Sequence, residues 1–241
     1  MPHVNDTKTA LVTGANKGIG FAIAQGLGTL SFTVAVGARD DARRAEAVER
    51  LRAAGVDAFG VALDVTSDDS VAAAAATIEQ TTGRLDVLVN NAGISGRFDG
   101  GAQDPTTLDL DVVRTVLDTN VFGVVRVTNA VLPLLLRADA PRVVNVSSNM
   151  GSLTLQTGPV MAAYAPSKSM LNSVTVQYAR RLADTDVIVN ACCPGYVATD
   201  FTGFNAPRTP EQGAAIAIRL ATLHADGPRG GFFDDAGVVP W

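Results

Sequence analysis

Short apolar runs alternate along this chain with longer, alanine-rich segments, and this alternation limits the possible folds more than any other feature. The runs are continuously apolar, which is expected of strands whose two faces are both covered by helices. Repeated strand–helix units of this length imply right-handed crossovers and a parallel sheet. The sequence therefore predicts an α/β protein with a doubly wound parallel sheet and helices on both faces. The expected strands are 9–13, 33–36, 58–63, 87–89, 142–146, 187–191 and 231–233, and the expected helices are 18–30, 42–54, 69–82, 109–136 and 164–182.

Length and composition are those of an ordinary soluble domain. The chain has 241 residues, of which 47% are hydrophobic and 18% charged, enough for a substantial core. Neither a linker-like composition nor an internal repeat interrupts the series, so we expect a single domain over residues 1–241. The net charge of −5 argues against nucleic acid as a partner, because phosphate binding needs a basic surface.

The sequence also argues against a membrane segment or a metal site. The N-terminal residues lack the basic and apolar regions of a secretory signal. The most apolar stretch, 121–136, contains Arg126 and Pro133 and is too short to span a bilayer. Cys192 and Cys193 read as buried thiols in a reducing compartment. Two histidines without a Cys-x-x-Cys pair give little support for a metal. We expect a cytoplasmic protein without membrane or metal.

A glycine-rich turn follows the first expected strand directly, in Thr13-Gly-Ala-Asn-Lys-Gly-Ile-Gly20. Glycines at a strand-to-helix turn let the backbone approach a pyrophosphate, which then lies at the positive end of the following helix. The spacing is Gly-x-x-x-Gly-x-Gly, which differs from the commoner Gly-x-Gly-x-x-Gly. The turn predicts a dinucleotide phosphate site. Its candidate residues are Gly14, Asn16, Lys17, Gly18, Ile19 and Gly20.

The end of the second expected strand bears on the choice between the two nicotinamide cofactors. An acidic residue there binds the ribose 2′-hydroxyl, whereas a basic residue accommodates a 2′-phosphate. The strand ends in Ala38-Arg39-Asp40, with Arg43 and Arg44 close behind. These cations, together with Lys17, favour NADP(H) over NAD(H). Asp40 is the complication, since a small shift of the strand end would move it toward the ribose.

Tyr164 and Lys168 lie four residues apart, a spacing that places both side chains on one face of a helix. A phenol is a weak acid with an unperturbed pKa of about 10. A nearby ammonium favours the phenolate and would lower that pKa, which makes proton transfer possible at ordinary pH. This spacing also occurs by chance on many helices, so its meaning depends on its surroundings.

Seven motifs follow one another in the order found in one enzyme family, and the chain resembles that family, the short-chain dehydrogenases/reductases, over essentially its whole length. The resemblance implies a Rossmann fold, a nicotinamide cofactor and a small-molecule carbonyl or alcohol substrate, and it is strongest to the carbonyl-reductase branch. The motifs are Thr13-Gly-x-x-x-Gly18-x-Gly20, Asp64-Val65, Asn90-Asn91-Ala92-Gly93, Asn120, Ser147-Ser148, Tyr164-x-x-x-Lys168 and Pro194-Gly195.

The resemblance implies a role for each catalytic residue. Tyr164 would be the general acid for carbonyl reduction, and Ser148 would bind and orient the substrate oxygen, with Ser147 as the competing assignment. Lys168 would hold the nicotinamide ribose and depress the tyrosine pKa. Asn120, in the middle of the long helix, would hold a water in a proton relay.

The resemblance also implies the remaining cofactor contacts. Asp64 would meet the adenine ring beside the backbone of Val65, and the loop after the fourth strand would lie next to adenine and ribose. Pro194 and Gly195 would shape the loop behind the nicotinamide, and Thr199 would bind its carboxamide. The cofactor-binding candidates outside the glycine turn are Arg39, Asp64, Val65, Asn91, Ala92, Gly93, Tyr164, Lys168, Pro194, Gly195, Val197 and Thr199.

Two regions bear on assembly and on the substrate. The interval from Ser148 to Tyr164 is too short for the helical insertion that keeps some carbonyl reductases monomeric. A homodimer or homotetramer built on the 109–136 and 164–182 helices is therefore expected. Residues 194–230, rich in Pro and Gly, should contain a substrate lid. Phe201, Phe204 and Trp241 are candidates to line the pocket, although ordinary packing would explain them equally well.

Three functions remain open. The first is an NADPH-dependent reductase of ketones or aldehydes, which is reversible alcohol oxidation. The second is a 3-ketoacyl thioester reductase acting on a carrier protein, which should require a basic docking patch. The third is a regulator that senses NADP(H) without turnover, although such proteins typically lose the tyrosine or the lysine.

Overall fold

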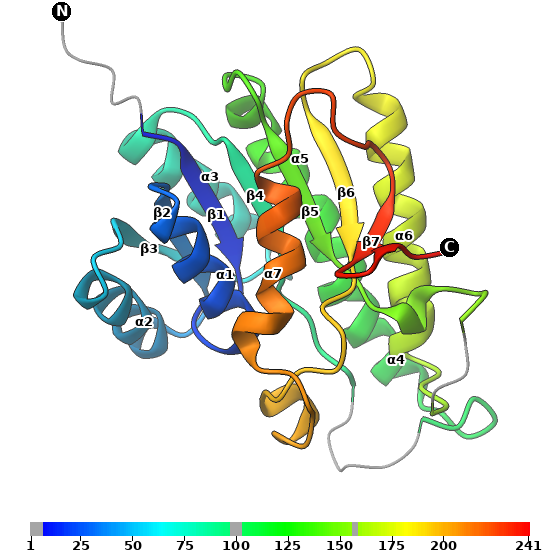
Figure 1. Cartoon of the computed structure of the whole chain (residues 1–241). Coiled ribbons are helices and arrows are strands. Elements are labelled where there is room, and N and C mark those ends of the chain that lie inside the picture. Colours follow the sequence, from blue (N-terminus) through cyan, green and yellow to red (C-terminus); the bar gives the residue numbers. More distant parts are fainter. Residues whose placement is uncertain (1–6, 97–102, 156–158) are drawn as a thin grey trace, which may run out of the picture.

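A computed structural model describes residues 7–96, 103–155 and 159–241. Its first half alternates strands and helices in the expected order (Figure 1). Every expected strand is present, with ends that move by at most two residues. The elements of this half are β1 (Thr9–Thr13), α1 (Gly18–Thr29), β2 (Thr33–Ala38), α2 (Asp41–Ala53), β3 (Ala58–Ala62), α3 (Asp68–Thr82) and β4 (Val87–Asn90).

The second half contains both helices that the sequence predicts there, 109–136 and 164–182, together with elements that it does not predict. The expected 109–136 helix is present, but a π-helical turn, η1, interrupts it. Helix α7 and strand β8 are additional. The elements are α4 (Leu110–Leu117), η1 (Asp118–Phe122), α5 (Gly123–Leu135), β5 (Arg142–Val146), η2 (Asn149–Gly151), α6 (Tyr164–Arg181), β6 (Ile188–Cys192), η3 (Asp200–Thr202), α7 (Pro210–Ala221), β7 (Phe232–Asp234) and β8 (Gly237–Val238).

The eight strands found in the described residues form one sheet with the order β3-β2-β1-β4-β5-β6-β7-β8. Pairing is parallel from β3 to β7, and only β8 is antiparallel to its neighbour. The chain first builds outward from β1 to β3 and then continues from β4 on the other side of β1. This arrangement confirms the predicted doubly wound parallel sheet, and the reversal of direction lies between β1 and β4.

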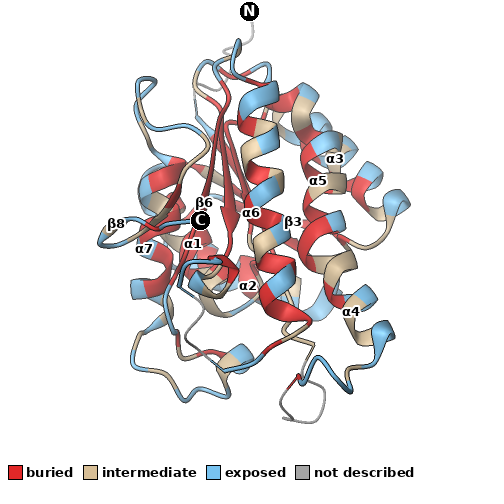
Figure 2. Cartoon of the chain, turned by 90° about the vertical axis from the view of Figure 1, so that its right-hand side faces the viewer, coloured by how far each residue is buried: buried red, intermediate tan, exposed pale blue. Residues whose placement is uncertain are grey.

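Helices cover both faces of the sheet, as the continuously apolar strands require. Val12 and Val36 pack toward α1, α2 and α7, where Ile23 and Ile216 complete one core. Leu11 points to the other face, where α3, α5 and α6 enclose a second core. In Figure 2 the buried strands lie between these two layers, and each helix turns its buried side toward them.

Helix α7 is part of the layer that covers the sheet. Its residues Ala214, Ile216, Ala217 and Leu220 belong to the core on the α1 face. Helix α7 therefore packs as a structural helix, which narrows the range over which a lid is expected to the residues before it. A capping box at Thr209 and Gln212, followed by Pro210 in the first turn, is the sequence signal that could have located this helix.

Candidate active site

The sequence-predicted site residues gather at the carboxyl ends of the parallel strands, where the arrowheads in Figure 1 point. The glycine turn follows β1, Asn91 follows β4, Ser148 follows β5 and Pro194 follows β6. These loops flank the point between β1 and β4 where the strand order reverses. In open α/β sheets, ligands bind in the crevice outside the strand ends at this point.

The glycine turn has the geometry of a phosphate cradle. Gly14 and Gly18 have φ values of +65° and +55°, a left-handed conformation that glycine adopts without strain. A Cβ on Gly20 would lie 2.4 Å from both Asn91 Nδ2 and Gly14 O, so no side chain fits there. Lys17 begins α1 without a side-chain cap, which leaves the first amides of the helix available to an anion. The turn therefore fits a dinucleotide pyrophosphate.

Hydrogen bonds fix the loop after β4 against the end of β1. The hydroxyl of Thr13 accepts from the amides of Asn91 and Ala92, both at 3.0 Å. Asn91 Nδ2 in turn donates to Thr13 O at 2.9 Å. Thr13, the first residue of the glycine-turn motif, thus holds two of the predicted cofactor residues, Asn91 and Ala92, beside that turn.

Arg39, directly after the end of β2, is exposed, and Asp40 beside it has a structural role. The Asp40 carboxylate accepts from the Arg43 amide at 2.9 Å and caps α2. Hydrogen bonds from Thr66 lower the pKa of Asp64, and the charge of Arg39 contributes to the same shift. Arg39 and Asp64 therefore lie close enough to interact, at the expected adenosine end of the site.

The other nearby cations are engaged within the protein. Arg44 donates to Ala38 O at 2.9 Å and to Asp41 at 2.7 Å, so it stabilises the β2–α2 turn. Lys17 forms an ion pair with Asp200 at 3.1 Å. Because Asp200 begins η3, this pair joins the glycine turn to the segment after β6. Both side chains of the pair are about half exposed.

The structure brings Tyr164 and Ser148 together. Burial raises the pKa of the Tyr164 phenol, and a hydrogen bond with Ser148 partly opposes that rise. The Ser148 hydroxyl itself accepts from the amide of Met150 at 3.2 Å, which fixes its position at the start of η2. Ser147 is directed elsewhere, to Asn172 at 2.6 Å. Of the two serines, Ser148 is therefore the one beside the phenol.

Lys168 lies beside Tyr164, but it does not act as expected on the phenol. Its Nζ donates to Val146 O at 2.8 Å and lies 5.7 Å from the centre of the tyrosine ring. Burial lowers the pKa of Lys168 to about 8. The tyrosine pKa is raised rather than depressed, because burial outweighs the groups that would lower it. Lys168 is buried among main-chain groups at the ends of β4 and β5.

Asn120 is fully buried in η1, and its side chain joins the β4 loop to α6. Its Oδ1 accepts from the amide of Ile94 at 2.9 Å, and its Nδ2 donates to Ile94 O at 2.9 Å and to Ser167 Oγ at 3.0 Å. These bonds hold the amide group between the β4 loop and α6.

Sequence reasoning misses one residue of the site, Gln103. It is 4% exposed, and its Oε1 accepts from the amides of Ala163 and Tyr164 at 3.0 and 3.1 Å. Its Nε2 donates to Ser95 O. No local motif marks this glutamine, since its partners lie about 60 residues away in the sequence.

The segment after β6 lies over the glycine turn. A Cβ on Gly18 would approach Thr199 Cγ2 to 3.2 Å, which places Thr199 near the start of α1. Pro194 is buried, and Gly195 adopts a φ of +77°. Val197 turns its side chain toward Gly213 of α7, so only its main chain can face a cofactor. Val65 is likewise buried, against Gly123.

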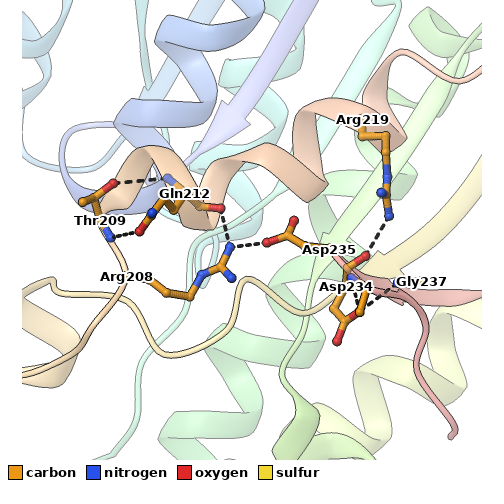
Figure 3. A network of polar contacts seen from close by, with 8 residues as sticks. Arg208, Thr209, Gln212, Arg219, Asp234, Asp235 and Gly237 are labelled. Carbon is orange, nitrogen blue, oxygen red and sulfur yellow. Dashed lines mark hydrogen bonds and ion pairs between the residues drawn. The ribbon is translucent and has the colours of Figure 1, made fainter.

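A polar network anchors the far end of this segment. Arg208 pairs with Asp235 and donates to Gln212 O at 2.6 Å, while Arg219 donates to Asp234 O at 2.7 Å (Figure 3). The network ties the start of α7 to the turn between β7 and β8. The segment 195–209 is thus held at its exit by this network, and nearer its centre by the pair between Lys17 and Asp200.

The three aromatic candidates for the pocket differ in position. Phe201 packs on Tyr164, with ring centroids 5.3 Å apart, so it lies at the site. Phe204 is 66% exposed. Trp241 stacks on Phe232 of β7 at 5.6 Å.

No group of three or more His, Cys, Asp or Glu side chains among the described residues could hold a metal ion. None of the helices in this part of the chain is long and apolar enough to cross a membrane.

Comparison with known proteins gives matches along almost the whole chain. The sequence profile described as short chain dehydrogenase matches residues 8–209. Carbonyl reductase [NADPH] 1 of Rattus norvegicus is 34% identical, with 98% of this chain and 99% of the rat protein aligned. Salutaridine reductase from Papaver somniferum has a similar structure, with a TM-score of 0.85, 30% identity and coverage of 95% of this chain and 99% of that one. A 3-oxoacyl-[acyl-carrier protein] reductase with bound NAD from Brucella melitensis is also similar in structure, with a TM-score of 0.84 and 30% identity. The match covers 98% of this chain and 92% of that one.

Proposed function

The chain belongs to the short-chain dehydrogenase family of oxidoreductases, and from this membership we propose that it is an NADPH-dependent reductase of ketone or aldehyde carbonyls. The observation that carries the proposal is that Ser148 lies beside the buried phenol of Tyr164 and acts on its pKa, one helical turn from Lys168. A carbonyl oxygen placed between the two hydroxyls would be oriented by one and protonated by the other.

Cofactor binding is assigned to the loops at the carboxyl ends of the strands. The glycine turn, from Gly14 to Gly20 and including Asn16 and Ile19, takes the pyrophosphate. Arg39 takes the 2′-phosphate together with Lys17, which would exchange its half-exposed pairing with Asp200 for the phosphate, and Asp64 with Val65 takes the adenine. The loop after β4, through Gly93, lies against the ribose. Pro194, Gly195, Thr199 and the main chain of Val197 take the nicotinamide. The cradle at Gly20 and the exposed Arg39 support this assignment.

The protein's own residues supply the proton and the geometry of the reaction. Bound NADPH supplies the hydride. Tyr164 is protonated at neutral pH and can act as the acid, and the Ser148 hydroxyl partly opposes the rise in its pKa that burial causes. Ser148 orients the oxygen, and Lys168, with a pKa of about 8, still carries a proton at neutral pH that can be passed toward the phenol. Asn120 holds the cofactor loop and α6 together, which keeps these groups in register.

The walls of the site favour an uncharged, apolar carbonyl compound. From Val143 to Ser167 the sequence contains no charged residue, and this stretch includes the whole connection from Ser148 to Tyr164. In the segment 196–207 the single charged residue is Asp200, which pairs with Lys17. Leu153 is 76% exposed, and Phe201 lies over Tyr164. A charged substrate would find no counter-ion on these two segments.

A direct test compares the purified protein with its Tyr164→Phe variant on a panel of neutral ketones and aldehydes, by the loss of NADPH absorbance. We expect wild-type turnover and a loss of about 10²–10⁴-fold in kcat for the variant, the range for removal of a general acid. NADPH binding, measured by fluorescence, should be retained. Turnover that survives the substitution would refute the mechanism. Cofactor binding without turnover on any substrate would instead support the regulator.

A second candidate is reduction of a 3-ketoacyl thioester on a carrier protein. The likeness to the acyl-carrier protein reductase from Brucella melitensis favours it. The lack of basic residues in 143–167 and 196–207 argues against this second function, because an acidic carrier needs a basic docking surface. Competition between a neutral ketone and a ketoacyl carrier protein separates the two. A kcat/KM that is higher for the carrier-bound thioester would favour this second function.

A further inference from the structure

The loop after β4 and the first turn of α6 meet at Gln103. The two segments carry different parts of the proposed chemistry, because the loop lies against the cofactor and α6 carries Tyr164. Gln103 forms an isolated parallel bridge with Met161, just before the helix, and its own main-chain oxygen accepts from the amide of Ala162 at 3.1 Å. Gln103 is therefore fixed to the segment that leads directly into α6 and Tyr164.

The side chain of Gln103 completes the start of α6. The N-cap residue of this helix is Ala163, which has no side-chain hydrogen bond to offer. The first amides of a helix have no partner within it and must be satisfied from outside. Oε1 of Gln103 accepts from two of them, those of Ala163 and Tyr164. The tyrosine's own amide is thus one of the two groups that Gln103 holds.

The opposite end of the same amide group reaches the cofactor loop. Nε2 of Gln103 donates to the main-chain oxygen of Ser95, which directly follows Ile94. Asn120 makes the equivalent link one residue earlier, from Ile94 to Ser167 beside Lys168. Two buried amide side chains therefore join one loop to one helix, Asn120 next to the lysine and Gln103 next to the tyrosine.

We propose that Gln103 is a positioning residue for Tyr164, which sets the distance between the phenol and the cofactor loop. The proposal rests on the proposed function, since it assumes that Tyr164 donates the proton. Its physical basis is the sensitivity of proton and hydride transfer to small misplacements, of which a shift of about 1 Å can cost about 10²-fold in rate. Gln103 lies outside the proposed substrate and cofactor contacts and acts on Tyr164 through helix α6.

The test uses Gln103→Met, which removes both hydrogen-bonding groups at nearly constant length. We expect kcat to fall by about 10- to 100-fold, while the KM for NADPH changes by less than about threefold. Gln103→Glu keeps an acceptor for the two amides, but it loses the donor to Ser95 O and places a carboxylate oxygen against that carbonyl, so it should protect the start of α6 without restoring kcat. Full recovery of kcat by Glu would overturn the proposal, because the link to the cofactor loop would then be dispensable.

Gln212→Met is a matched control for helix capping. Gln212 Oε1 accepts from the Thr209 amide at 2.9 Å at the start of α7, so this variant also removes a glutamine cap. We expect both Met variants to lower Tm, and only Gln103→Met to lower kcat. A double variant with Tyr164→Phe gives a second readout. Adding Gln103→Met to Tyr164→Phe should cause little further loss of residual turnover, whereas multiplying losses would mean that Gln103 acts independently of the tyrosine.

Amide hydrogen exchange tests the proposal separately from turnover. In Gln103→Met the amides of Ala163 and Tyr164 should exchange faster than in wild type, and in Gln103→Glu they should remain protected. Unchanged exchange in the Met variant would overturn the positioning role even if no substrate were found. Wild-type turnover with an unaffected Met variant would overturn the positioning role alone. Absence of wild-type turnover, with altered exchange, would overturn the proposed reaction alone.

Discussion

Lys168 is a buried residue of the site whose pKa lies close to the pH range of an ordinary assay. Burial lowers its pKa from 10.5 to about 8, while its Nζ donates to Val146 O. Between these two pH values the unfolded chain holds a proton that the folded protein has released. The contribution of Lys168 to stability is therefore unfavourable at neutral pH, and stability gains from this group as the pH rises from about 8 to 10.5.

The same ionisation predicts the pH dependence of cofactor capture. We expect kcat/KM for NADPH, which reports the free enzyme, to fall as the pH rises through about 8, because Lys168 then loses the charge that holds the ribose. The measurement is a pH profile from 6 to 10, approximately, with a buffer series of constant ionic strength. In Lys168→Arg, which stays charged, the alkaline limb of the remaining activity should move to higher pH. An unmoved limb would assign it to another group.

Site residues differ in how far sequence reasoning reaches them. Tyr164, Lys168 and Ser148 carry side chains of distinctive chemistry in recognisable spacing, so they could be predicted, although their roles remain to be tested. The raised pKa of Tyr164 could not be predicted, because burial is a property of the packed structure. Gln103 could not either, since its two amide partners belong to a helix about 60 residues further along. The capping role of Asp40 at the start of α2 could have been predicted, because Asp before a helix is a common N-cap.

Among the elements, the apolar strands were predicted best because each is buried on both faces. The ends of β1 and β5 are those expected, and the others move by only one or two residues. Elements whose signal is not periodic apolarity were missed. Strand β8 has two residues, and η1 depends on a change of hydrogen-bond spacing inside a continuous helix. Helix α7 is the exception, since its capping box and the helical spacing of Ala214, Ala217 and Ala221 are sequence signals of a helix.

The turn between β1 and α1 yields a prediction at the scale of elements. Gly20→Ala would place a methyl group 2.4 Å from Gly14 O, so the turn must open. We expect a loss of about 1–3 kcal/mol in the free energy of unfolding and a loss of NADPH binding. Denaturant unfolding and cofactor fluorescence measure the two effects.

Gly83→Ala serves as the control for Gly20→Ala. Gly83 ends α3 at a φ of +74° and has open space around its Cβ position. An alanine there should cost about 1 kcal/mol through backbone strain alone and leave cofactor binding unchanged. Equal losses of NADPH affinity in the two variants would mean that the effect at Gly20 is one of general stability.

For the whole molecule, a homo-oligomer built on α4, α5 and α6 remains a prediction. Three large apolar side chains are exposed on adjacent elements of this face: Leu110 on α4 at 63%, Phe122 on η1 at 44% and Met170 on α6 at 42%. We expect light scattering to give the mass of a dimer or a tetramer.

The double substitution Phe122→Glu, Met170→Glu should lower the measured mass, because charges would be buried in the interface. Leu30→Glu is the control, since Leu30 is 52% exposed at the end of α1, in the other helical layer. A wild-type mass equal to that of one chain would contradict the expectation. So would an equal response of the mass to both kinds of variant.

The sole tryptophan of the chain gives this protein a built-in optical probe. The ring of Trp241 stacks on Phe232, and its main-chain oxygen accepts from the hydroxyl of Thr154 at 3.0 Å. Thr154 lies in the connection that begins at Ser148 and ends at Tyr164. Emission from an unlabelled sample therefore comes from one point whose surroundings change whenever that connection moves, so stopped-flow fluorescence can time the movement against hydride transfer.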